Sequence, residues 1–195
     1  MRHMSGSEEE IIQRAQSGDK DALSKLVNEY SPMIYRFSYN VCRNDERAQN
    51  TTQETFLSMV KNIKQFNNKS KFSTWLYTIV SNHCFMLARK NKPGRFVSID
   101  DDEHPVAENI YAESDATPDE LLERTNVREL LQEAMDKLAP EYRIIFTLRD
   151  VEGLSTAEVA QITDLSVPAV KSRLHRARAF LREYLTPIFE EETNG

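Results

Sequence analysis

The sequence contains few of the residues that build strands, metal sites or disulfide frameworks. Among 195 residues there are only five glycines and two cysteines, and runs of valine, isoleucine and threonine are rare. Cys42 and Cys84 are expected to be reduced and partly buried rather than bridged. His83 has no other residue near it at metal-ligand spacing, so neither a metal site nor a cofactor is expected. The scarcity of glycine and of runs of valine, isoleucine and threonine favours an all-α protein.

Long apolar segments are missing as well. No run approaches the roughly 20 residues that span a bilayer, and the start, MRHMSGSEEE, lacks the apolar stretch of a signal peptide. We therefore expect a cytoplasmic location without membrane insertion. A glycine-rich phosphate loop and a nucleophile–base pair are also absent, which argues against an enzyme.

The charge is distributed unevenly, although the total is −6. Residues 8–92 carry 13 basic and 9 acidic residues, residues 93–122 carry one basic and nine acidic residues, and residues 123–195 carry 10 basic and 13 acidic residues. The acidity is concentrated in the middle of the chain, and the net charge hides two surfaces that can be cationic.

Apolar periodicity predicts helices in both halves. In the first half, helices are expected from the Asp19 cap to Tyr30, at about 32–42 and 47–63, and from Ser73 to the basic run at 89–92. Expected apolar stripes are Phe56, Leu57, Val60 and Ile63 in the first half, and Leu130, Leu131, Ala134 and Leu138 in the second.

The segment between the two halves shows no sustained periodicity. We therefore expect two small helical domains, 8–92 and 117–189, joined by a flexible acidic linker at 93–116. A flexible linker of this kind has a root-mean-square span of about 30 Å. This is close to the length of one turn of DNA, about 34 Å. The negative charge of the linker suits either a segment that mimics a nucleic acid or a solvated spacer.

A helix-turn-helix is predicted in the second half. Ser155 and Glu158 form a capping-box pattern, residues 163–165 break the short helix, and Ser166 is expected to cap a cationic helix. Five Lys or Arg residues and no acid lie between Leu165 and Arg182. Long cationic side chains suit guanine edges and phosphates. A solvated amphipathic helix is the alternative, but the cap, the turn and the missing acids favour DNA binding.

Four segments together resemble a known family. GDKDALSKLVNEY, QETFLSMVKNI, FSTWLYTIVSNHCFMLARK and LAPEYRIIFTLRDVEGLSTAEVAQITDLSVPAVKSRLHRARAFLR resemble the extracytoplasmic-function (ECF, group IV) sigma factors of bacterial RNA polymerase. The resemblance extends from about Glu9 to Leu185. It implies two helical domains, region 2 and region 4, which act by binding and have no catalysis of their own.

The resemblance also implies roles for particular residues. Region 4 would read the −35 promoter element as duplex with Ser166, Lys171, Ser172, Arg173, Arg176 and Arg178. Region 2 would read the −10 element as melted non-template strand with Asn67, Asn68, Lys69, Ser70, Lys71, Phe72 and Asn82. Tyr77 is a further candidate, since its ring could stack on an unpaired base. Arg89, Lys90 and Lys92 are expected to contact phosphates, whereas Trp75 is expected mainly to pack in the core.

Core RNA polymerase, promoter DNA and an anti-sigma factor are the implied partners. On the polymerase, the largest-subunit coiled coil and the flap would be contacted, the former by Asn50, Gln53, Glu54 and Phe56. The family pattern acidic-Ala-x-Asp plus two apolar residues is replaced here by RAQNTT at 47–52, which leaves the polymerase affinity open. An autonomous helix-turn-helix regulator is the rival hypothesis, and it would leave the first ninety residues unexplained.

Overall fold

The computed structural model describes residues 7–90 and 130–193, and all elements in these ranges are helices. The N-terminal unit (residues 7–90) consists of α1 (Ser7–Gln16), α2 (Lys20–Cys42), α3 (Asp45–Asn62), the 3-10 turn η1 (Ile63–Gln65) and α4 (Phe72–Lys90). The C-terminal unit (residues 130–193) contains helical residues 130–137, then α6 (Pro140–Phe146), the π-helical turn η2 (Thr147–Val151), α7 (Thr156–Thr163) and α8 (Val167–Thr193). The all-α prediction is confirmed.

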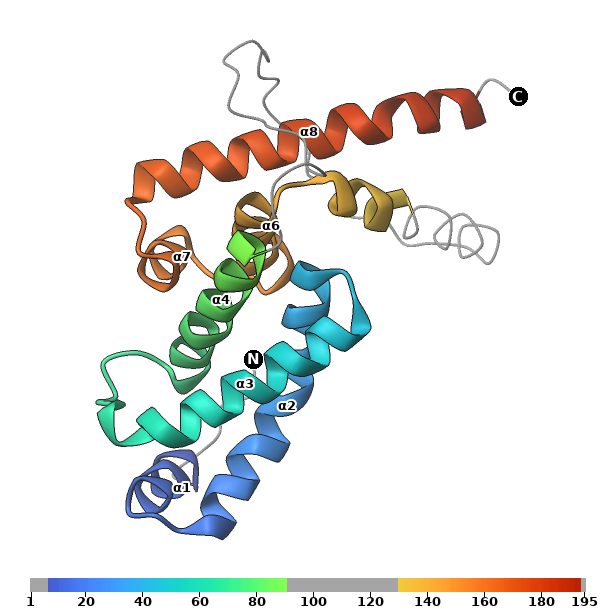
Figure 1. Ribbon diagram of the computed structural model, residues 1–195. Helices are drawn as coiled ribbons and strands as arrows, with labels where there is room; N and C mark the ends of the chain where they lie inside the picture. Colours follow the sequence, from blue (N-terminus) through green and yellow to red (C-terminus); the bar gives the residue numbers. More distant parts are fainter. Residues whose placement is uncertain (1–6, 91–129, 194–195) are drawn as a thin grey trace.

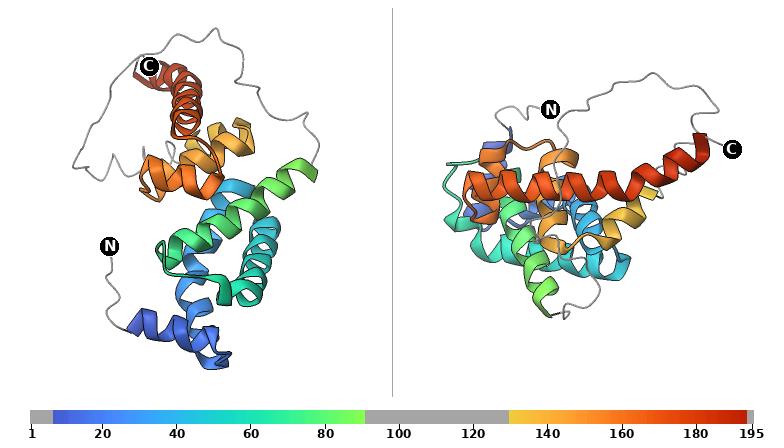
Figure 2. Two further views of the ribbon diagram at one scale, coloured as in Figure 1. Left: turned by 90° about the vertical axis from the view of Figure 1, so that its left-hand side faces the viewer. Right: turned by 90° about the horizontal axis from the view of Figure 1, so that it is seen from above.

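The two units are packed against each other (Figure 1). Helix α4 contacts α2 and α3 within its own unit and α6 and α7 of the C-terminal unit, and both views of Figure 2 agree with this placement. Phe37 and Leu76 belong to the same buried cluster as Ile144, Leu148 and Val159. The predicted linker at 93–116 lies outside the described residues, and the predicted domain boundaries remain predictions.

Helix α1 was not predicted, because its apolar residues are few. Ile12 and Ala15 are buried while the rest of the helix is mostly polar. Its end is joined to the start of α2 by the ion pair between Arg14 and Asp19, at 2.6 Å. Asp19 is the N-cap of α2, as predicted, and its Oδ1 accepts hydrogen bonds from the Asp21 and Ala22 amides at 2.9 and 3.1 Å.

The prediction of separate helices before and after Pro32 was wrong, since α2 is continuous through this residue. A proline in a helix interior removes one hydrogen bond and costs about 3 kcal/mol. The pyrrolidine ring of Pro32 is exposed, whereas Leu26, Ile34 and Phe37 on either side of it are buried in one core. Burial along both halves of α2 offsets the local cost, which a reading of the proline alone does not take into account.

Two of the predicted apolar stripes are also corrected. Leu57 and Val60 are 46% and 44% exposed, while Met59 of the same helix is fully buried. Leu131 is 37% exposed, although Ala134 and Leu138 are buried as predicted. Within the described ranges, none of the helices combines the length and the apolar character that crossing a membrane requires.

Candidate nucleic-acid interface

The predicted helix-turn-helix is formed by α7, a short turn and the first part of α8. The capping box is confirmed: the Glu158 amide donates to Ser155 Oγ at 3.2 Å, and the Ser155 amide donates to Glu158 Oε2 at 2.8 Å. These bonds lower the pKa of the Glu158 carboxyl. Asp164 ends α7 with a left-handed backbone (φ 54°), and Ser166 Oγ accepts from the Ala169 amide at 3.3 Å.

Helix α8 has one face buried in the core and a cationic face that lies outside the core. The stripe packed against the other helices consists of Val170, Leu174, Ala177 and Leu181. Lys171 and Ser172 are exposed, and Arg173 and Arg176 are half-buried. Because buried and cationic positions alternate around the helix, the buried stripe orients α8 while the basic side chains project from its other faces.

Arg178, also predicted to bind DNA, is engaged within the protein. Its Nε and Nη2 donate to the two carboxylate oxygens of Asp150 at 2.8 and 2.6 Å. Both partners are partly exposed, and exposed ion pairs contribute only about 0–1 kcal/mol. A phosphate could therefore replace the carboxylate at little cost.

The loop predicted to read a single strand lies between η1 and α4. Asn67, Asn68, Lys69 and Lys71 are exposed, and Ser70 is half-buried. Asn68 adopts a left-handed backbone (φ 57°), and Asn67 Oδ1 accepts from the Lys69 amide at 3.2 Å. Gln16, which sequence reasoning missed, holds the base of the loop by donating from Nε2 to the carbonyls of Ile63 and Phe66 at 3.0 and 2.7 Å. The loop thus presents polar groups on a fixed support.

Two of the predicted −10 readers, Phe72 and Tyr77, are core residues instead. They are 3% and 4% exposed. Phe72 packs edge-on against Phe66 at 5.2 Å, and Trp75 packs beside both rings, in line with the packing role expected for Trp75. Helical spacing cannot show which side of α4 is covered, so the prediction that Phe72 and Tyr77 face DNA is wrong for this arrangement.

Tyr77 instead belongs to a polar contact between the two units. Its hydroxyl donates to Glu152 Oε2 at 2.7 Å, and Arg36 Nη2 donates to the same oxygen at 3.0 Å. The Glu152 side chain is only 6% exposed. Burial, and then the Glu152 carboxylate, raise the pKa of Tyr77. No local sequence signal identifies Glu152, because its partners are distant in the chain.

Two further side chains fasten the units together at the end of α2. Arg143 of α6 is buried and donates from Nη1 to the Val41 carbonyl at 2.7 Å. Burial lowers the pKa of Arg143 to about 10. Arg43 donates from Nε to Asp136 Oδ1 at 2.6 Å. We call these bonds and the Tyr77–Glu152–Arg36 group the interdomain contact.

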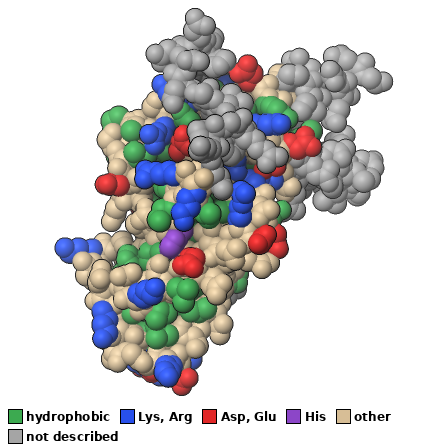
Figure 3. All heavy atoms as spheres, in the orientation of Figure 1, with side chains coloured by type: hydrophobic (Ala, Val, Ile, Leu, Met, Phe, Trp, Pro, Cys, Tyr) green, Lys and Arg blue, Asp and Glu red, His purple; other side chains and the backbone are tan. Residues whose placement is uncertain are grey.

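The remaining predicted region 2 residues are spread along α4. Asn82 is exposed and lies ten residues beyond Phe72, about 15 Å along the helix axis. Arg89 and Lys90 are exposed at its C-terminal end, and Lys92 lies outside the described residues. Lys and Arg side chains lie over both units on the face shown in Figure 3. The loop lies before the start of α4, Asn82 lies near its middle, and the basic residues lie at its C-terminal end.

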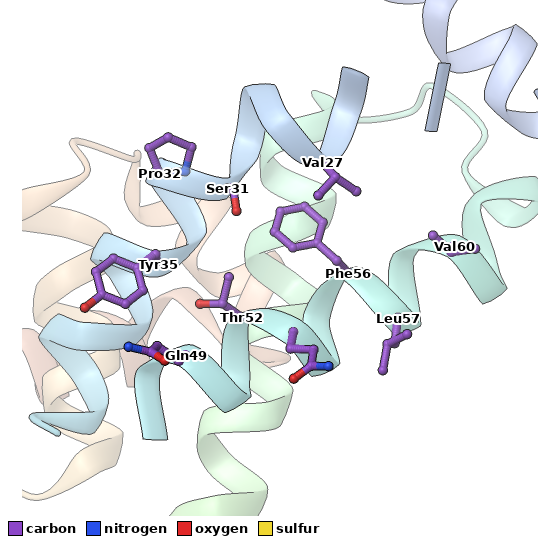
Figure 4. A pocket seen from close by; sticks show the side chains of 10 residues that line it. Val27, Ser31, Pro32, Tyr35, Gln49, Thr52, Phe56, Leu57 and Val60 are labelled. Carbon is purple, nitrogen blue, oxygen red and sulfur yellow. The ribbon is translucent and has the colours of Figure 1, made fainter. Parts of the chain in front are cut away.

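An apolar groove of about 670 Å³ lies between α2 and α3. Phe56 reaches from α3 toward Val27 of α2, and the exposed Leu57 and Val60 form one end of the groove (Figure 4). Of the residues predicted to bind the polymerase, Gln53 and Phe56 line the groove. The other two, Asn50 and Glu54, are exposed on the same helix.

The unusual threonines beside this groove are accommodated in the core. Thr51 and Thr52 are 2% and 9% exposed, where the family pattern has two apolar residues. Thr52 Oγ1 donates to the Ala48 carbonyl at 2.7 Å, which satisfies its hydroxyl within the helix. Arg47 and Asn50 are exposed, so these two departures from the pattern change the surface charge.

Comparison with known proteins matches both units to one family. The Sigma-70 region 2 profile matches residues 26–93, and the Sigma-70 region 4 profile matches residues 128–181. The ECF RNA polymerase sigma factor SigW of Bacillus subtilis is 33% identical over 182 residues, which cover 91% of this chain and 96% of SigW. The RNA polymerase sigma-H factor of Pseudomonas aeruginosa is 28% identical, over 94% of this chain and 96% of the relative.

Solved structures with the same fold come from complexes. CnrH in complex with the cytosolic domain of CnrY has a TM-score of 0.62 at 23% identity, over 91% of this chain and 96% of the solved chain. The sigma factor RpoE in complex with the anti-sigma factor NepR from Bartonella quintana has a TM-score of 0.60 at 21% identity, over 84% and 96%. At these identities the likeness concerns the fold.

Proposed function

The chain belongs to the ECF sigma factors of the sigma-70 family, and we propose that it binds core RNA polymerase and directs transcription initiation at promoters that it selects itself. One observation carries the proposal: a region 2 and a region 4 profile match the same chain, in order. An autonomous helix-turn-helix regulator would account only for the region 4 match and would leave the region 2 match unexplained. Sigma factors are non-enzymatic initiation factors, so the activity lies in binding.

Region 4 reads the −35 element as duplex through the cationic face of α8. Lys171, Arg173 and Arg176 supply long donors for base edges and phosphates, while Ser166 and Ser172 are short polar groups suited to phosphates. The exposed positions of Lys171 and Ser172 support this assignment. Arg178 also contacts the DNA, once its hydrogen bonds to the Asp150 carboxylate are replaced by hydrogen bonds to a phosphate.

Region 2 reads the −10 element as a melted non-template strand. The exposed amides of Asn67, Asn68 and Asn82 can read base edges once a base has left the stack. Basic residues on either side hold the backbone: Lys69 and Lys71 in the loop, Arg89 and Lys90 at the end of α4, and Lys92 beyond it. Their contribution steepens the salt dependence of binding rather than setting the sequence.

The groove between α2 and α3 takes the coiled coil of the largest polymerase subunits. Gln53 and Phe56 in its lining, with Asn50 and Glu54 beside it, support this contact. Region 4 meets the flap. An anti-sigma factor is proposed as the inhibitory partner, because a solved sigma factor of the same fold is in complex with one.

Run-off transcription with reconstituted core polymerase tests the proposal. We expect transcripts from selected promoters only when the protein is added, and poor promoter binding by the protein alone. Tight operator binding without polymerase, together with no transcript in its presence, would establish the autonomous regulator instead.

Within this function, Arg173→Ala is expected to weaken −35 recognition by about 1–3 kcal/mol, the discrimination that a bidentate guanine contact provides. The measurement is the affinity of reconstituted holoenzyme for promoter fragments with intact and substituted −35 elements. Lys137→Ala removes an exposed lysine of the same unit outside α8 and serves as the control. An unchanged −35 preference in Arg173→Ala would remove this residue from the base-reading set.

Asn82→Ala is expected to impair a later step, the opening of the promoter. The loss should be about 1–3 kcal/mol if the amide pairs with an unpaired base through two bonds. Permanganate reactivity of unpaired thymines measures opening, and fragment binding measures −35 recognition in parallel. Gln13→Ala removes an exposed amide of α1 as the control. Equal losses in opening and in −35 binding would contradict the division of labour between the two units.

A further inference from the structure

Two carboxylates lie two residues apart in the chain segment between α6 and α7. Asp150 belongs to the π-helical turn η2, and Glu152 is the C-cap of this turn. The Glu152 amide donates to the Thr147 carbonyl at 2.9 Å, and Gly153 follows with a left-handed backbone (φ 71°), which favours glycine. These features fix the backbone around the two carboxylates. We call residues 150–152 the acidic turn.

Asp150 occupies a side chain that the proposed function assigns to DNA binding. Its two carboxylate oxygens accept from Nε and Nη2 of Arg178 at 2.8 and 2.6 Å. A guanidinium group holds a phosphate through the same pair of parallel hydrogen bonds. The carboxylate therefore takes the place of a DNA phosphate, and Arg178 can use this pair of donors for DNA only after the ion pair breaks.

Glu152 engages the N-terminal unit in a similar way. Its Oε2 accepts from the Tyr77 hydroxyl of α4 at 2.7 Å and from Arg36 Nη2 of α2 at 3.0 Å. Two donors from different helices thus converge on one anionic oxygen. Tyrosine hydroxyls and arginine guanidinium groups are common donors to the phosphates of nucleic acids. Arg36 and Tyr77 therefore have the chemistry of a phosphate-binding site, and the Glu152 carboxylate fills it while the units are docked.

Both donors belong to the N-terminal unit, whereas Glu152 belongs to the C-terminal unit. The Tyr77 ring meets Phe37 of its own unit edge-on at a centroid distance of 5.4 Å, and this packing does not involve the C-terminal unit. The Arg36 side chain is 59% exposed even with Glu152 in place. Separation of the units would therefore leave both donors on one surface and remove only the carboxylate.

We propose that the acidic turn is an autoinhibitory contact, in which Asp150 and Glu152 occupy phosphate-binding groups of region 4 and region 2 while the protein is free. Asp150 occupies Arg178 within region 4. Glu152 occupies Arg36 and Tyr77 of region 2, which bind a phosphate of the single strand once the units separate. The inference rests on the proposed promoter reading and adds Arg36 to its residues. It also gives a physical reason for the poor promoter binding expected of the protein alone.

Fluorescence anisotropy with a single-stranded oligonucleotide of random sequence tests the contact at Glu152, since phosphate contacts carry no sequence information. Glu152→Ala is expected to bind the strand about 5–150-fold more tightly than the unaltered chain, which is the shift that loss of the acceptor gives the docking equilibrium. Glu133→Ala removes the same charge at an exposed position of the same unit and should change the affinity much less. Equal affinities of these two variants would overturn the proposal.

Combined variants show whether Arg36 and Tyr77 bind the strand. Arg36→Gln and Tyr77→Phe, each combined with Glu152→Ala, should lose most of the gain, because each removes one donor and keeps the rest of the site. A gain that persists in both would overturn the phosphate-binding site.

Hydrogen–deuterium exchange of the unaltered chain gives a test without any variant. Saturating single strand should speed exchange in α6 several-fold, because strand binding and docking compete and each must weaken the other. Unchanged exchange in α6 would overturn the proposal.

Duplex DNA of random sequence tests the contact at Asp150. Asp150→Asn should bind the duplex about two- to fivefold more tightly, in keeping with the small contribution of an exposed ion pair. Glu133→Gln is the matched control. In the presence of Arg178→Ala, Asp150→Asn should bring no gain. An equal gain with and without the Arg178 side chain would show that Asp150 acts by general repulsion of DNA and would overturn the contact.

Run-off transcription separates failure of this inference from failure of the proposed function. Transcripts with the unaltered chain, without the gains in Glu152→Ala and Asp150→Asn, would overturn the autoinhibitory contact and leave the proposed function standing. Gains in nucleic-acid binding without any transcript would overturn the proposed function and leave the occupation of the phosphate-binding groups standing.

Discussion

Replacing Glu152 by lysine is expected to separate the two units of the free protein and to increase its radius of gyration. Glu152 accepts from Tyr77 and Arg36, and its side chain is almost fully buried. Lysine would leave the Tyr77 hydroxyl without an acceptor, at about 1–3 kcal/mol, and place a second cation beside Arg36. The equilibrium between docked and open forms would shift by about 5–150-fold from the lost acceptor alone.

Small-angle X-ray scattering measures this separation. Glu133→Lys makes the same charge change at an exposed position of the C-terminal unit and should leave the radius of gyration unchanged. The same radius of gyration in both variants would show that Glu152 does not hold the units together. Glu152→Gln, which keeps an acceptor oxygen for Tyr77 but loses the ion pair, should fall between the two.

Phe37→Ala is expected to reduce the free energy of unfolding by about 3–5 kcal/mol, the usual loss for a buried phenylalanine. The Phe37 ring is fully buried in α2 and meets Tyr77 edge-on at a centroid distance of 5.4 Å. Its removal leaves a cavity beneath the residue that contacts Glu152. Because a whole domain is stable by only about 5–15 kcal/mol, this one change removes a large fraction of the total.

Urea unfolding followed by circular dichroism gives the free energies for comparison. Met86→Ala shortens a side chain that is 56% exposed on α4 and should change stability by no more than about 0.5 kcal/mol. A loss below about 1 kcal/mol in Phe37→Ala would mean that the surrounding side chains close the cavity, or that Phe37 is not central to the core.

Local patterns predicted the features that depend on neighbouring residues. The cap at Asp19, the capping box at Ser155 and the cap at Ser166 were all read from the sequence and are all present. Each of them depends on a side chain and an amide two or three residues away, which the sequence places together directly. The buried stripe of α8 followed for the same reason.

The residues whose burial or exposure was predicted wrongly have a common cause. Leu57, Val60 and Leu131 are apolar and at helical spacing, yet they are exposed, because none of the helices in residues 7–90 and 130–193 covers that side. Phe72 matched the family's flipped-base site and Tyr77 was a candidate for stacking on an unpaired base, yet the fold buries both side chains in the core. Periodicity identifies an apolar stripe, but the direction of that stripe depends on which element is packed opposite.

By itself, the sequence determined the all-helical class, the division into two units, the helix-turn-helix and the family. These follow from composition, from spacing within a few residues and from motifs in order along the chain. Only the tertiary structure decided that the two units share one core and that Glu152 meets Tyr77 and Arg36. Each of these contacts joins residues that are far apart in the chain, and no local propensity brings such residues together. The contacts form because the helices pack so that they cover one another's apolar faces.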